Sequence, residues 1–154
     1  MLLVCTRYVK NKEEAEDVLQ DSFVKLFQNI KQYTGLGSFE GWVRRIVVNT
    51  ALEAIRKRKL EYAPDDIANF SNDENAEYDA ISKMGFDELI SLIQEMPTGC
   101  QLIFNLYVIE GFNHQEIAEK LGVTKGTSKS QLARARRIMK EKIGKYYAIK
   151  EIIQ

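Results

Sequence analysis

The sequence predicts an all-α protein made of two small helical domains. Three observations support this class. Apolar residues recur at three- and four-residue steps over most of the chain, no useful stretch alternates apolar and polar residues as a strand would, and an acidic segment near the middle separates two periodic halves. With 154 residues, of which 45% are hydrophobic, the chain can bury two small cores.

The first half is predicted to hold two helices separated by a break at Gly35 and Gly37. Acidic residues occupy the first turns of the first helix, as the helix dipole favours. Ser38 can cap the second helix, which we expect to run from Ser38 to Lys59 and to end in four basic residues. The periodic residues of the first helix, assigned mainly to the core, are Ala15, Val18, Leu19, Ser22, Phe23, Leu26 and Phe27.

A linker is predicted between the halves. Residues 61–79 hold seven acidic residues, no lysine or arginine, and a proline. A segment of this composition cannot bury enough apolar surface to fold alone. We therefore expect a first domain over residues 1–60, a flexible linker over 61–82 and a second domain over 83–149.

The second half is predicted to hold four helices. Periodic apolar residues from Phe86 to Met96 make the first, which Pro97 stops, and a second around Leu102 to Tyr107 closes near Gly111. Two short helices joined at Gly122 follow. The expected domain is similar in layout to winged-helix domains.

The segment Asn113–Arg136 has the features of a helix-turn-helix. Asn113 and Glu116 stand three apart, as in a capping box. Gly122 can take the left-handed conformation that turns the chain, and Thr124 can cap the second helix. In this interpretation Leu132 points inward, whereas Ser128, Lys129, Gln131 and Arg134 point outward.

These features predict DNA binding. A helix-turn-helix places the start of its second helix in the major groove, where Ser, Gln, Lys and Arg suit base edges. Residues 120–145 carry nine basic residues and one acidic residue, which suits phosphate contacts. The alternative is a helical hairpin with a solvated basic face, but the coincidence of caps, turn and ordered apolar positions favours DNA.

Other function classes find little support in the sequence. Cys5 and Cys100 are far apart with no neighbouring histidine, so neither a zinc site nor a cofactor is expected. The single histidine, His114, is assigned as a polar residue at a helix start rather than a catalytic base. We find no nucleophile–base pair and no glycine-rich phosphate loop, so an enzyme is not expected. No apolar run approaches about 18–20 residues, so we expect a cytoplasmic protein without membrane insertion.

The order of the motifs points to a family. An acidic-fronted helix over Glu14–Phe27 precedes the helix beginning at Ser38, and the basic tail, the acidic linker and the helix-turn-helix follow. This arrangement resembles the extracytoplasmic-function (ECF) subfamily of bacterial RNA polymerase sigma factors over nearly the whole chain. The resemblance implies sigma domain 2, a linker and sigma domain 4. It also implies core RNA polymerase and promoter DNA as partners, and a membrane-associated anti-sigma factor is common in such families.

The resemblance assigns site residues by position. Polar core-polymerase contacts would be Asp17, Gln20, Asp21 and Lys25, and Phe23 or Phe27 would pack partly against the polymerase. Contacts to the −10 element would be Arg44, Arg45, Asn49, Arg56, Lys57 and Arg58, with Asn49 near a flipped base. Contacts to the −35 element would be Thr127, Ser128, Lys129, Ser130, Gln131, Arg134 and Arg136, of which Thr127 and Arg136 would bind phosphates. For Trp42 the spacing favours core packing over base stacking, and Phe39 is compatible with both.

Two departures and two alternatives accompany this interpretation. The family more often has a valine-like residue at Ser128. Its members usually begin with roughly one more helix before Met1. Either the true start lies upstream, or this is a shortened chain whose first domain lacks its first helix. One alternative is a helix-turn-helix regulator that does not replace a sigma factor, although residues 1–59 carry no signature of a ligand pocket. The other is a helical interaction protein, which leaves two basic surfaces beside an acidic linker unexplained.

Overall fold

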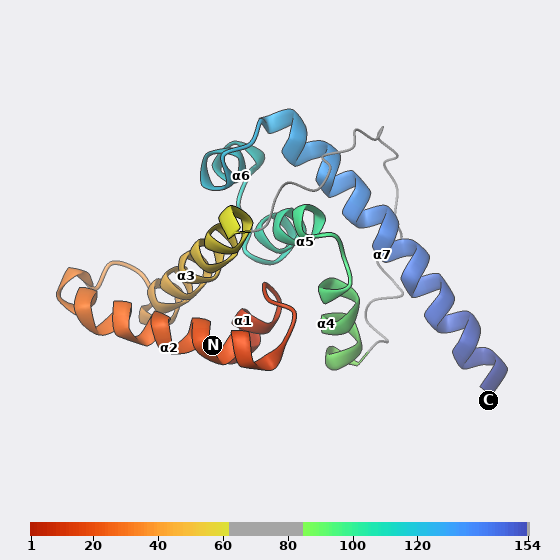
Figure 1. Cartoon of the computed structure of the whole chain (residues 1–154), viewed down its shortest axis with the longest axis horizontal. Coiled ribbons are helices and arrows are strands. Elements are labelled where there is room, and N and C mark those ends of the chain that lie inside the picture. Colours follow the sequence, from red (N-terminus) through yellow and green to blue (C-terminus); the bar gives the residue numbers. More distant parts are fainter. Residues whose placement is uncertain (62–84, 154) are drawn as a thin grey trace. The chain divides into compact units, whose positions relative to one another are not determined.

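The computed structural model describes residues 1–61 and 85–153, and every regular element in these two ranges is a helix. The predicted all-α class is confirmed. The chain divides into two compact units, Met1–Asp66 and Ile67–Gln154 (Figure 1). The predicted linker lies outside the described residues, apart from Glu61 at the end of a helix.

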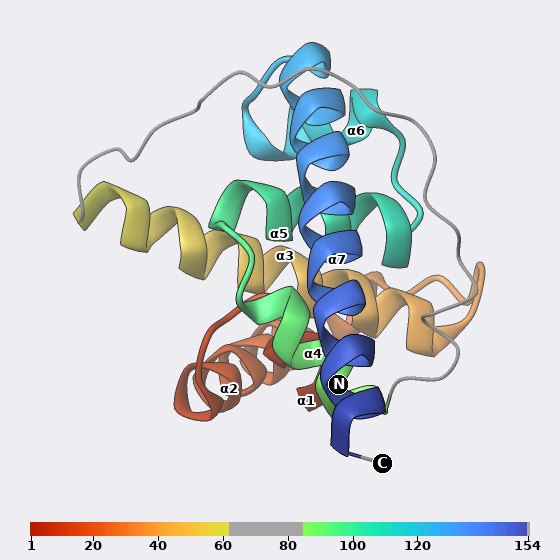
Figure 2. The ribbon, with the colours of Figure 1, turned by 90° about the vertical axis from the view of Figure 1, so that its right-hand side faces the viewer.

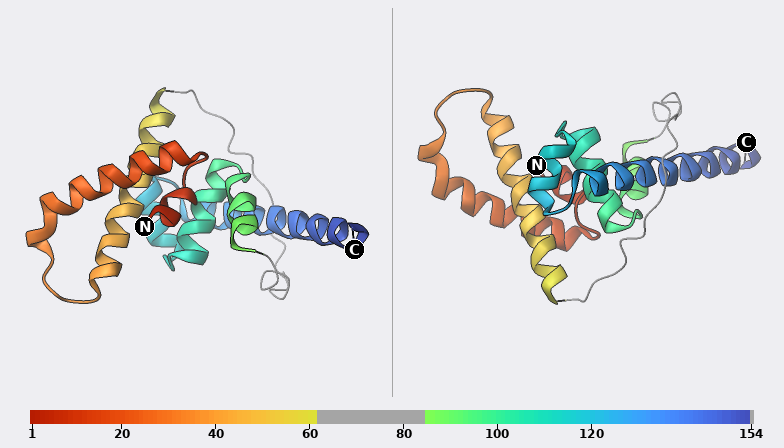
Figure 3. Two further views of the ribbon diagram at one scale, coloured as in Figure 1. Left: turned by 90° about the horizontal axis from the view of Figure 1, so that it is seen from below. Right: turned by 90° about the horizontal axis from the view of Figure 1, so that it is seen from above.

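The first unit is a helical hairpin with a short helix packed against it. Its elements are α1 (Leu2–Thr6), α2 (Lys12–Asn29), the 3-10 turn η1 (Ile30–Gln32) and α3 (Phe39–Glu61). Ser38 Oγ accepts a hydrogen bond from the Gly41 backbone N at 3.0 Å, which confirms the predicted cap. Positive φ angles of 77° at Gly35 and 90° at Gly37 allow the turn between α2 and α3 (Figure 3).

The core of this unit comes from all three helices, and two predicted core residues are absent from it. Leu26 is 7% exposed, but Phe23 and Phe27 are 44% and 71% exposed. The prediction for these two phenylalanines was therefore wrong. An α-helix turns by about 100° per residue, so Phe27 points well away from Leu26. Phe23 stands four residues before Phe27 and therefore lies on nearly the same side of the helix.

The second unit holds five helical elements, and its last helix is longer than predicted. They are α4 (Phe86–Gln94), α5 (Thr98–Phe104), the π-helical turn η3 (Asn105–Ile109), α6 (His114–Leu121) and α7 (Lys125–Ile153). Helix α7 runs past α6, α5 and α4 for 29 residues (Figure 2). It continues because Leu132, Ala135, Met139 and Ile143 keep one buried face at helical spacing.

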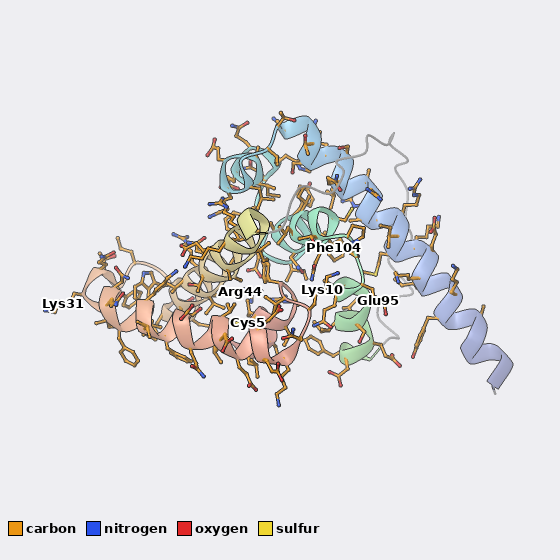
Figure 4. All side chains as sticks on the ribbon, in the orientation of Figure 1. Cys5, Lys10, Lys31, Arg44, Glu95 and Phe104 are labelled. Carbon is orange, nitrogen blue, oxygen red and sulfur yellow. The ribbon has the colours of Figure 1, made fainter. Side chains whose placement is uncertain are left out.

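Polar contacts join the second half of α7 to α4 and to Glu95, the residue that follows α4. Lys142 forms an ion pair with Glu95, and the Tyr146 hydroxyl donates a hydrogen bond to a carboxylate oxygen of Glu88. The labelled side chains in Figure 4 include Cys5 and Phe104, which are buried in their respective units, and Lys31, which lies in η1 where α2 ends.

Candidate functional site

An exposed polar stripe runs along α3. Arg45, Asn49 and Arg56 follow one another at steps that return to nearly the same side of a helix, and all three are exposed. Lys57 is also exposed, beside this stripe. Arg44 is half-buried and lies about a quarter turn away (Figure 4). The structure therefore groups Arg45, Asn49 and Arg56, with Arg44 and Lys57 each about a quarter turn away on opposite flanks. The side chain of Arg58 lies outside the described part of the chain.

Aromatic rings gather where α3 begins. The Tyr33 ring centroid lies 5.2 Å from that of Phe39 and 5.4 Å from that of Trp42. Trp42 is half-buried and Phe39 is 46% exposed. The core role expected for Trp42 thus applies to part of its ring, and Tyr33 is a member of the cluster that the sequence reasoning missed.

The outer face of α2 carries three of the four predicted polymerase contacts. Asp17, Gln20 and Asp21 are exposed and lie on the side of α2 that also holds Phe27. Lys25 points elsewhere, because its ammonium group forms an ion pair with the Glu53 carboxylate on α3. The structure therefore separates Lys25 from the other three residues.

The turn between α6 and α7 has the predicted geometry. Asn113 Oδ1 accepts hydrogen bonds from the backbone N atoms of Gln115 and Glu116 at 2.9 and 3.0 Å, and Glu116 returns a contact to the Asn113 backbone N. Gly122 has a φ of 67°, in the left-handed region. Thr124 Oγ1 accepts from the Thr127 backbone N at 3.0 Å and so caps α7. These contacts confirm the capping box, the turn and the second cap.

The expected outward orientation of Ser128 and Gln131 was wrong. Ser128 is 0% exposed and Gln131 is 8% exposed. Ser128 Oγ lies 2.9 Å from His114 Nδ1, and the Cys100 thiol donates a hydrogen bond to Gln131 Oε1 at 3.0 Å. Each of the two stands four residues before a buried residue of α7, so the phase of the helix turns both inward.

The remaining predicted residues leave a basic surface at the start of α7. Lys129 is exposed, and Thr127, Ser130, Arg134 and Arg136 are half-buried. Lys125, the first residue of α7, is also exposed. Lys125 was predicted only as part of the basic charge of residues 120–145 and not as a contact, although its place directly after the Thr124 cap is visible in the sequence.

Burial and neighbouring charge set the ionisation of three groups in the described residues. Burial raises the pKa of the Cys5 and Cys100 thiols, which keeps them protonated and unreactive. Burial, followed by the charges of Lys129, Lys125 and Arg136, lowers the pKa of His114. Within residues 1–61 and 85–153 there is no group of three histidine, cysteine, aspartate or glutamate side chains placed to hold a metal ion. None of the helices in these ranges is both long and apolar enough to span a membrane.

Comparisons with known proteins identify both units. Residues 2–61 match the family described as Sigma-70 region 2, and residues 86–139 match Sigma-70, region 4. The ECF RNA polymerase sigma factor SigE of Mycolicibacterium smegmatis is 32% identical over 88% of this chain, which spans 54% of that relative. The chain belongs to the ECF sigma factors.

Other relatives agree with this membership. The ECF RNA polymerase sigma-E factor of Haemophilus influenzae is 28% identical to this sigma factor. The match covers 90% of this sigma factor and 78% of the relative. The solved sigma factor RpoE from Bartonella quintana, crystallised with the anti-sigma factor NepR, has the same fold with a TM-score of 0.57. It is 18% identical, and the match covers 91% of this sigma factor and 87% of RpoE.

The family regions coincide with the surfaces described above. Region 2 of this sigma factor spans α1, α2 and α3, and so contains the α2 outer face and the α3 stripe. Region 4 begins with α4 and reaches Met139 of α7, and so contains the helix-turn-helix. The second half of α7 lies beyond the matched region.

Proposed function

We propose that this sigma factor binds core RNA polymerase, directs it to specific promoters and helps to initiate transcription by binding alone, without a chemical step. One observation carries the proposal. A single chain combines an exposed stripe of basic and amide side chains on α3 with a capped helix-turn-helix that exposes Lys125 and Lys129. In this proposal residues 1–60 serve polymerase and the −10 element, residues 83–149 serve the −35 element, and residues 61–82 connect them.

The outer face of α2 is the proposed polymerase contact. The carboxylates of Asp17 and Asp21 and the amide of Gln20 suit a partner surface rich in arginine, since charge-assisted bonds to carboxylates are strong. Phe27, 71% exposed on the same side, would add an aromatic anchor of the kind that dominates interface energies. Lys25 would act indirectly, by holding α2 to Glu53 on α3.

The α3 stripe is the proposed −10 contact. Arg45, Arg56 and Lys57 would hold the phosphates of an opened strand, and Arg58 continues the same basic run. The Asn49 amide offers both a donor and an acceptor, which suits the edge of an unstacked base. Arg44, about a quarter turn from this stripe, would reach a different part of the strand.

The start of α7 is the proposed −35 contact. Lys129 and Ser130 lie in the part of the second helix that faces base edges in helix-turn-helix complexes, and Thr127, Arg134 and Arg136 flank them. Lys125 joins this set as a phosphate contact at the beginning of the helix. Ser128 and Gln131 leave it, because both side chains are buried.

The cellular setting follows from the same proposal. A protein that works on RNA polymerase and promoter DNA acts in the cytoplasm. An anti-sigma factor is a proposed further partner, and the support for it is that the solved relative RpoE was crystallised with NepR.

Promoter-directed transcription tests the proposal. The purified chain is mixed with core RNA polymerase from its host and with fragments of host DNA, and transcript starts are mapped. We expect discrete starts that disappear when the chain is omitted. If no chain-dependent start is found while the chain still binds duplex DNA, the helix-turn-helix regulator is the better interpretation.

A further inference from the structure

A part-buried polar contact joins the two helices of the helix-turn-helix. Ser128 on α7 is 0% exposed, and its Oγ shares a hydrogen bond with Nδ1 of His114 on α6 over 2.9 Å. Around this contact the α6–α7 interface is apolar, with Ile117, Ala118 and Leu132 buried. A buried hydroxyl loses free energy unless it has a partner, so this single contact favours one relative placement of the two helices.

The imidazole that receives Ser128 is itself held in place. The Tyr107 ring stacks on it with centroids 4.6 Å apart and an angle of 23° between the planes. The Arg136 guanidinium lies 5.9 Å from the centroid of the same Tyr107 ring. Tyr107 belongs to the π-helical turn η3, a rare element that occurs often at functional sites. His114 directly follows the N-cap Asn113 and lies within the capping box of Asn113 and Glu116, so its backbone is fixed as well.

The contact lies next to the surface proposed for the −35 element. Thr127 and Lys129 flank Ser128 in the sequence and lie on either side of the buried face of α7, half-buried and exposed respectively. A helix moves as a rigid unit over one turn, so whatever fixes Ser128 also fixes the backbone from which Thr127 and Lys129 project. Hydrogen bonds to base edges require precise placement of the side chains that read them, whereas electrostatic attraction to phosphates does not.

We propose that His114 is a positioning residue for −35 recognition, which acts by fixing Ser128 and thereby setting how the first turns of α7 enter the major groove. The inference rests on the proposed function and adds a specificity-determining residue to it. It also gives a role to the serine that stands here where the family more often has a valine-like residue, because the serine hydroxyl lies within hydrogen-bond distance of His114 Nδ1.

The test compares two promoters transcribed by the full chain assembled with core RNA polymerase. One has the −35 element that the wild-type holoenzyme selects from random sequences, and the other has a scrambled −35 element with the same −10 element. The readout is the ratio of transcripts from the two templates. Partial unfolding lowers both transcripts together and leaves the ratio unchanged, so a merely structural role does not move it.

Four variants separate the parts of the contact. Ser128→Ala removes the hydroxyl, and His114→Phe keeps a stacking ring but removes Nδ1. His114→Asn keeps a polar atom near the position of Nδ1. Ser91→Ala is the matched control, since it removes a hydroxyl from an exposed site on α4.

We expect Ser128→Ala and His114→Phe each to lower the ratio about fivefold to tenfold, as for directly coupled residues. The double variant should be no worse than either single variant, and His114→Asn and Ser91→Ala should stay within about twofold of wild type. An unchanged ratio in both single variants, or fully multiplicative effects in the double, overturns the inference. A wild-type chain that initiates no transcript overturns the proposed function instead, and a wild-type ratio of one removes −35 recognition and this inference with it.

Discussion

Two polar residues of α7 show how helix phase decides what a side chain does. Ser128 and Gln131 have the chemistry of base-reading residues, yet each stands four positions before a buried apolar residue and is buried with it. Their burial could have been predicted from the spacing of Leu132 and Ala135. Their partners could not, because His114 and Cys100 lie 14 and 31 residues away in the sequence.

Lys129 and Gln131 should therefore respond differently to alanine. Lys129→Ala is expected to weaken binding of −35 duplex and to lower the salt slope by about one, with little change in unfolding free energy. Gln131→Ala should lower the unfolding free energy by about 1–3 kcal/mol, because the buried Cys100 thiol loses its acceptor. Binding titrations at several salt concentrations and urea unfolding measure both effects. Weaker DNA binding by Gln131→Ala at an unchanged unfolding free energy would indicate that Gln131 contacts DNA directly.

His114 should make stability depend on pH. Its pKa in the folded protein is lowered by burial and by Lys129, Lys125 and Arg136, all on α7, and Tyr107 on η3 stacks against it. As the pH falls, His114 is therefore protonated in the unfolded chain before it is protonated in the folded protein. Its full contribution to the unfolding free energy is present above the ordinary histidine pKa, and it is lost as the pH falls through the lowered pKa of the folded protein. Between pH 7 and pH 5 the unfolding free energy should fall more steeply in wild type than in His114→Asn. Parallel pH profiles of the two proteins would contradict this.

At the scale of elements, local sequence predicted where helices start and turn, but not how long the helices are. The caps at Ser38, Asn113 and Thr124 and the turn at Gly122 depend on contacts within about four residues, so their motifs were sufficient. The length of α7 depends on α4 and α5, which cover its buried face from distant parts of the sequence. For the same reason the exposed side of α2, with Phe27, became evident only with the packing of α3 known.

Two glycines in the second unit test this account of the turn. Gly122→Ala should lower the unfolding free energy by about 1–2 kcal/mol, because φ is 67° there and a side chain disfavours that region. Gly144→Ala is the matched control, since an added Cβ meets nothing within 4 Å inside α7. It should raise the unfolding free energy by about 0.5–1 kcal/mol through helix propensity. Urea unfolding followed by circular dichroism measures both, and equal effects of the two substitutions would argue against the left-handed turn.

At the scale of the whole molecule, charge is segregated rather than balanced. The chain has 22 basic and 22 acidic residues, yet acids occupy the outer face of α2 while basic residues follow α3 and the start of α7. Overall composition would have argued against a nucleic-acid partner. The order of segments along the chain, rather than any single motif, allowed the family to be predicted from sequence.

This segregation predicts that polymerase binding and DNA binding can be lost separately. The double variant Asp17→Ala, Asp21→Ala should lower affinity for core polymerase at least about tenfold and leave −35 duplex binding unchanged. The double variant Lys129→Ala, Arg134→Ala should do the reverse. Asp87→Ala, which removes an exposed acid from α4, serves as the control. Pull-down with core polymerase and duplex titration provide the two measurements, and loss of both activities in either variant would contradict the assignment of surfaces.

The unbroken length of α7 has a mechanical consequence. Its 29 residues form a rod about 43 Å long, whose first turns belong to the helix-turn-helix and whose second half is tied to α4 through Glu95 and Glu88. A rod of this length is a lever: a tilt of about 5° at one end displaces the other by roughly 4 Å. A tilt of the whole helix would therefore move Lys129 relative to the base pairs, and the contacts of α7 with α4, α5 and α6 oppose such a tilt.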